Sequence, residues 1–189
     1  MTRLRLLVTL MLALVPLVLS ACGSDDDPAV SPPSSTADAD RNQADVEFAQ
    51  GMIPHHEQAI EMSDLALAQA VAPEVKDLAQ RIKDAQTPEI ETMRGWLENW
   101  GEELASGAHS TGMMSEQEMG DLEAATGAEF DRMFLTMMKA HHETAIEMAQ
   151  TELDEGQNVD AKELAQAIID AQQAEIEEID GLLAAMGNG

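Results

Sequence analysis

Two pairs of adjacent histidines are the residues of this sequence best suited to chemistry. His55-His56 and His141-His142 lie in matching stretches, with methionines at the same relative positions in both. Residues three or four positions apart share one face of a helix, so a methionine and a histidine at that spacing can bind one ligand. Imidazole nitrogens bind transition metals, and thioethers prefer soft ions. The predicted metal ligands are His55, His56, His141, His142, Met52, Met138, Met62 and Met148.

Two glutamates in the middle of apolar helix faces are the second signal. Glu89 stands in a row of core-facing side chains, and Glu175 takes the corresponding place later in the chain. A carboxylate on such a face is costly unless it is paired. A carboxylate bonded to one imidazole nitrogen also orients the other nitrogen for metal binding. We therefore expect both glutamates to pair with facing histidines, and Gln86 and Gln172 to belong to the same network.

The types of the ligands indicate which metal they would hold. Carboxylate-bridged di-iron bundles carry Glu-x-x-His on two helices, and this sequence has no Glu-x-x-His. Met52 and Met138 stand three positions before His55 and His141 instead. Methionine with histidine favours copper, as Cu(I) or Cu(II), over zinc.

The middle connection of the chain holds further soft ligands. These residues predict either a second metal site or a loop whose methionines cover one end of the fold. They are His109, Met113, Met114 and Met119.

The composition excludes several classes of protein. Lys and Arg total 10 against 36 Asp and Glu, which gives a formal net charge of −26. No basic patch for nucleic acid, or for an anionic membrane surface, can be assembled from that balance. Aromatic residues make up only 3%, with no Tyr, which favours helices over an all-β fold. No nucleophile with a paired base stands out, so we predict a protein that is not an enzyme.

An internal repeat defines the elements that must position these residues. Residues 48–101 align with 134–187 at an offset of 86 without a gap, and 24 of the 54 aligned pairs are identical. That period is too long for a solenoid unit and fits a duplicated helical hairpin. Two hairpins predict an all-α four-helix bundle. We expect its long helices at 43–70, 74–100, 127–154 and 160–186.

Two capping boxes support these boundaries. Ser115 with Glu118 predicts the start of a short helix in the middle connection, and Thr126 with Glu129 predicts the start of the third long helix.

The N-terminus resembles a bacterial lipoprotein signal. Arg3 and Arg5 precede an apolar run that is too short for a comfortable transmembrane helix, and small residues stand just before Cys22. The resemblance implies a signal peptide at 1–21, lipidation of Cys22 and a lipid anchor in the cell membrane, on its extracytoplasmic side. Residues 22–42 are polar and Pro-rich and predict a disordered tether. The folded domain is expected at 43–187.

The repeated motif Met-x-x-His-His-x-x-Ala-Ile-x-Met, together with the Ala-Gln-x-x-Glu-Ile stretches, resembles the bacterial DUF305 family. The resemblance covers about 43–187. It implies a ferritin-like four-helix bundle in a secreted or membrane-anchored protein, and some members are associated with copper binding and copper resistance. It further implies metal binding by the eight ligands named above and a role for the loop at 112–114.

These observations favour an extracytoplasmic copper-binding lipoprotein that buffers or sequesters copper. Its expected partners are the metal ion and, through the lipid, the membrane. Two alternatives stay open. One is a metallo-oxidase acting on Cu(I), and the other is an envelope interaction module whose histidine cluster responds to pH without binding metal.

Overall fold

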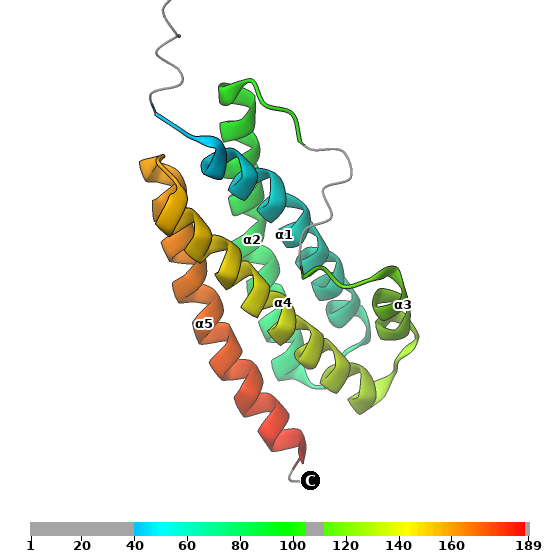
Figure 1. Ribbon diagram of the computed structural model, residues 1–189. Helices are drawn as coiled ribbons and strands as arrows, with labels where there is room; N and C mark the ends of the chain where they lie inside the picture. Colours follow the sequence, from blue (N-terminus) through cyan, green and yellow to red (C-terminus); the bar gives the residue numbers. More distant parts are fainter. Residues whose placement is uncertain (1–39, 105–111, 188–189) are drawn as a thin grey trace, which may run out of the picture. The chain divides into compact units, whose positions relative to one another are not determined.

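Five α-helices make up the part of the chain that the computed structural model describes, residues 40–104 and 112–187 (Figure 1). The helices are α1 (Gln43–Gln69), α2 (Pro73–Trp100), α3 (Glu116–Ala124), α4 (Gly127–Glu155) and α5 (Val159–Gly187). All-α architecture is confirmed, and each end of the four long helices lies within one residue of its expected position. None of the helices among the described residues is long and apolar enough to span a membrane.

The helix starts follow local capping chemistry, with one exception to the prediction. Ser115 and Glu118 form the expected capping box of α3. Thr126 is the N-cap residue of α4, but its side chain makes no capping hydrogen bond, so that predicted box is wrong. Gly127 follows with a φ of 63°, whereas a capping box needs helical geometry at this position.

The helices pair as two hairpins. α1 packs along α2, α4 packs along α5, and the hairpins meet mainly through α1 and α4, while α2 and α5 have little contact (Figure 1). α1 and α4 run antiparallel, because the α1 N-terminus lies at the α4–α5 loop and the α4 N-terminus lies at the α1–α2 loop. The central helix pair is therefore the one that carries the histidines.

An aspartate in each hairpin accepts hydrogen bonds from the loop of the other hairpin, and the sequence analysis missed both aspartates. Asp131 in α4 accepts hydrogen bonds of 2.9–3.0 Å from the backbone N–H groups of residues 71–72. Asp45 in α1 accepts hydrogen bonds of 2.8–2.9 Å from the backbone N–H groups of residues 157–158. The two aspartates, like the two loops, are related by the repeat offset of 86, which was the available signal. We call these contacts the reciprocal clasps.

The apolar core is divided into two clusters. The Phe48 cluster takes its buried residues from 46–53 of α1, 90–97 of α2, 145–149 of α4 and 165–169 of α5. The buried residues of the Phe130 cluster come from 59–70, 75–82, 130–138 and Ile179, together with Leu122 of α3 and Ala125. On each of the four long helices, the residues between the two clusters include polar side chains predicted for the site. We call this set the polar layer, and its members are His55, His56, Gln86, Glu89, His141, His142, Gln172 and Glu175.

Candidate metal centre

His55 and His141 form the centre of the polar layer, where α1 meets α4. Their ring centroids are 3.6 Å apart and their planes are inclined by 36°. The two residues are at most 1% exposed. They are equivalent positions of the repeat, so each hairpin contributes the same residue to this contact.

His56 and His142 pair with the two glutamates, as the sequence predicted. His56 Nε2 lies 2.8 Å from Glu89 Oε2, and His142 Nε2 lies 2.7 Å from Glu175 Oε2. A neutral imidazole that donates its Nε2–H to a carboxylate keeps its lone pair on Nδ1. The imidazoles are fully buried, whereas the glutamate side chains are 17–18% exposed. Each glutamate therefore orients a buried imidazole from the edge of the fold.

Six ring nitrogens of the four histidines have no hydrogen-bond partner among the described residues. They are both nitrogens of His55 and His141 and Nδ1 of His56 and His142. Burial, together with the neighbouring imidazoles, lowers the pKa of His55 to about 3 and that of His141 to about 2. The backbone of His55 gives only a small opposing contribution to the His141 pKa, and no hydrogen bond of normal geometry reaches that ring. Both central rings are therefore neutral at pH 7, the form that binds metals.

The predicted methionine ligands lie on both sides of the polar layer. Met52 is fully buried in the Phe48 cluster, and Met148 packs against the same cluster from the other hairpin. A Cβ placed on Gly51 would stand 3.0 Å from Met148 Cε, so this thioether reaches α1 directly beside Met52. Met62 and Met138 are buried together in the Phe130 cluster. Each flank therefore combines one thioether from each hairpin, not two from one helix.

The remaining members of the polar layer are the two glutamines. Gln86 and Gln172 are 3% exposed, and among the described residues neither oxygen, nor the Gln86 amide nitrogen, has a partner. No three His, Cys, Asp or Glu side chains in the described ranges converge as a ready-made metal cage. A metal ion held here would therefore need thioether sulfur or a shift of the rings in addition to the imidazoles.

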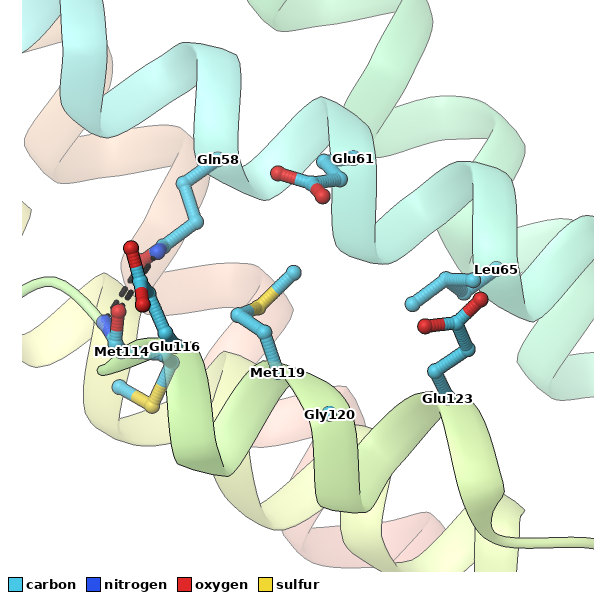
Figure 2. Close-up of a pocket in the computed structure, with 8 residues that line it drawn as sticks. All are labelled: Gln58, Glu61, Leu65, Met114, Glu116, Met119, Gly120 and Glu123. Carbon is cyan, nitrogen blue, oxygen red and sulfur yellow. Dashed lines mark hydrogen bonds between the residues drawn. The ribbon is translucent and has the colours of Figure 1, made fainter.

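The middle connection is only partly described. His109 lies outside the described residues, whereas Met113, Met114 and Met119 lie within them and are half-buried. Figure 2 shows the Met119 side chain directed toward α1 across a cavity of about 380 Å³, while Met114 meets Gln58 through its backbone. Gln58 holds Met114 by two hydrogen bonds that the sequence analysis missed. The structure does not bring these methionines into the polar layer.

The fold and the site define a class of protein: a duplicated helical hairpin with buried histidines where its two halves meet. The model of the DUF305 family (Domain of unknown function) matches residues 45–183, and the chain belongs to that family. No curated protein matches the sequence.

Solved structures of related proteins share this fold. A DUF305 protein of Streptomyces coelicolor, predicted to be secreted, is 32% identical, with a TM-score of 0.73 over 76% of this chain and 92% of its own. A DUF305 fragment from Deinococcus radiodurans is 29% identical, with a TM-score of 0.71 over 76% of this chain and 97% of its own. CopM in its Cu(I)-bound form is 30% identical, with a TM-score of 0.68 over 76% of this chain and 98% of its own. Structures of CopM with Cu(II) and with Ag are also similar to this chain.

Proposed function

We propose that this protein is an extracytoplasmic lipoprotein that binds copper in the polar layer and thereby buffers or sequesters it. One observation carries the proposal: six buried ring nitrogens of the four histidines in the polar layer have no hydrogen-bond partner among the described residues. Each unsatisfied buried polar atom costs about 1–3 kcal/mol. A bound metal ion would satisfy several of them at once.

Copper fits the donors that surround these nitrogens. Imidazole binds both oxidation states of copper, and thioether adds affinity mainly for Cu(I). Glu89 and Glu175 would hold His56 and His142 so that Nδ1 is presented to the ion. The similarity to CopM, which has been solved with Cu(I), Cu(II) and Ag, supports this choice.

The position outside the cytoplasm rests on the N-terminal sequence. Cys22 and the segment before it lie outside the described residues, so lipidation is proposed from the signal pattern alone. The Cys22→Ser variant should be lost from the membrane fraction, because a single acyl-modified anchor would be removed. Membrane retention of that variant would show a different anchor.

The pH-responsive alternative finds little support at the centre of the site. The pKa values of His55 and His141, about 3 and about 2, lie far below the range near pH 6 in which histidine sensors act. Oxidation of Cu(I) is the remaining alternative, and oxygen consumption on addition of Cu(I) would favour it.

The deciding experiment replaces His55 and His141 by Leu together. Leu fills a similar volume without ring nitrogens, so the helices should form while copper affinity falls at least about 100-fold, given that losing even an orienting partner costs about 10–100-fold. Competition with a copper chelator measures the affinity, and far-UV circular dichroism checks the fold. Copper affinity equal to that of the wild type would move the site elsewhere. Met52→Leu with Met138→Leu should weaken Cu(I) more than Cu(II).

A further inference from the structure

The segment that precedes α3 contacts both α4 and α1. Gln58 of α1 binds the backbone of Met114 through two hydrogen bonds. Gln58 Nε2 donates to the Met114 carbonyl at 2.8 Å, and the Met114 N–H donates to Gln58 Oε1 at 2.7 Å (Figure 2). At its other end, Gly112 lies directly on Thr144 of α4. A Cβ on Gly112 would stand 2.2 Å from the Thr144 side chain, and Gly112 has a φ of 81°.

The two residues that hold this segment are equivalent positions of the repeat. Gln58 lies one helical turn beyond His55, and Thr144 lies one turn beyond His141. Because α1 and α4 run antiparallel, the two contacts stand on opposite sides of the His55–His141 ring pair along the helix axes. The chain from Gly112 to Met114 therefore passes from α4 to α1 at the level of the His55–His141 pair.

We propose that residues 112–114 form a latched strap that sets how fast metal ions reach and leave the His55–His141 pair. The inference rests on the proposed copper site and names a control on its access. Gln58 is the latch, since its amide holds both backbone groups of Met114. Gly112 is the seat, since a side chain there meets Thr144 and a left-handed backbone.

The latch is tested with Gln58→Thr, which installs the residue that the second hairpin carries at the same position. Loss of the two hydrogen bonds should raise strap opening roughly tenfold, which corresponds to about 1.4 kcal/mol. The full chain is loaded with Cu(I), and release to an excess of bicinchoninate is followed by stopped flow. We expect release and uptake to accelerate together, with the dissociation constant changed less than about twofold.

Gln80→Thr is the matched control for the latch. Gln80 is an exposed glutamine of α2 that bonds only to Asp84 in the same helix among the described contacts. Its release rate should equal that of the wild type. An unchanged release rate in Gln58→Thr would contradict the latched strap. A dissociation constant that rises while the uptake rate stays constant would contradict it as well.

The seat is tested with Gly112→Ala against Gly101→Ala. Gly101 has a similar φ of 72°, but a Cβ there has nothing within 4 Å, so the control carries the backbone strain without the clash. Only Gly112→Ala should accelerate release. Equal effects of the two substitutions would contradict a seated strap.

A readout without metal separates this inference from the proposed function. Diethyl pyrocarbonate modifies exposed neutral imidazoles, and mass spectrometry identifies the modified residue. In the metal-free chain, His55 and His141 should react about tenfold faster in Gln58→Thr than in Gln80→Thr. If the wild type binds no Cu(I) and this difference persists, the copper function fails and the strap stands. If copper binds tightly and neither release nor modification changes, the strap fails alone.

Discussion

In His56 and His142, the two ring nitrogens have different surroundings. Nε2 of each ring is hydrogen-bonded to a glutamate, while the buried Nδ1 has no partner in the part of the chain that the structure describes. A carboxylate–imidazole pair of this kind fixes both the ring orientation and the nitrogen that carries the proton. In the proposed copper site, the glutamates would therefore act by orienting the histidines and not as ligands.

Glu89→Gln and Glu175→Gln should each weaken copper binding by about 10–100-fold, less than the loss of the central histidine pair. The amide keeps the size of the carboxylate but no longer fixes the proton on Nε2. Glu91→Gln and Glu177→Gln, two residues further on and exposed, are the matched controls. Chelator competition measures all four variants. Equal affinities for Glu89→Gln and Glu91→Gln would remove the glutamate from the site.

At the scale of the helices, the two reciprocal clasps are not identical. Glu152 of α4 is 1% exposed and lies beside Asp45. At the equivalent position of the repeat, near the other clasp, the chain has Ala66. Burial, a hydrogen bond to Asp45 and the charge of Asp45 raise the pKa of Glu152 to about 8, so this carboxyl is protonated at pH 7. Burial opposes ionisation of Asp45, but the surrounding N–H donors and Glu152 lower its pKa overall. The Asp45 clasp therefore contains a protonated carboxyl, that of Glu152, and the position equivalent to Glu152 near the other clasp carries no carboxyl.

Glu152→Ala should remove a pH dependence of stability between about pH 4.5 and 8. In that window the folded chain keeps a proton that the unfolded chain, with a Glu pKa near 4.5, releases. The contribution of Glu152 is therefore present below pH 4.5 and is lost as the pH rises through 8, by at most about 1.4 kcal/mol per pH unit. Urea denaturation of wild type and variant at several pH values measures the difference.

Glu155→Ala is the control for this titration, because Glu155 is an exposed acid one turn away. Its stability difference from the wild type should be flat over the same pH range. A flat difference for Glu152→Ala as well would place an ionised carboxylate in the clasp.

The helices and the His–Glu pairs were predictable because they repeat. The periodicity of the apolar residues and the offset of 86 indicate the same helix boundaries in both halves. A glutamate on an apolar helix face is costly unless it is paired, and the histidines on the facing helix are its natural partners. The Gln58–Met114 latch was not predictable, because a side-chain amide bonded to a loop backbone leaves no periodic signal. The packing of Met148 against the Phe48 cluster, which contains Met52 of the other hairpin, was missed because helix spacing describes neighbours on one helix only.

At the scale of the whole molecule, like charges oppose folding. The formal charge of −26 is spread over a chain with only 10 basic residues. Several basic residues form exposed ion pairs, such as Arg81 with Glu178 and Lys139 with Asp180. Exposed pairs contribute about 0–1 kcal/mol each, so repulsion among the unpaired acids should dominate.

Added salt should therefore stabilise the protein. Raising NaCl from about 10 mM to about 150 mM shortens the screening length from about 30 Å to about 8 Å. We expect the Tm of the metal-free chain to rise, as followed by circular dichroism, because screening weakens repulsion more than it weakens the few ion pairs. A falling Tm would mean that the ion pairs outweigh the repulsion.

The reciprocal clasps also bear on how such a chain could have arisen. The first hairpin contains Asp45 and the loop at residues 71–72, to which the aspartate of the other hairpin binds. The second hairpin contains the equivalent aspartate and the equivalent loop. A single hairpin thus presents a self-complementary, isologous surface, so two identical copies could form both clasps and bring four histidines together. The protein then corresponds to a symmetric homodimer whose subunits were fused, and Glu152 is a place where the two former subunits have since diverged.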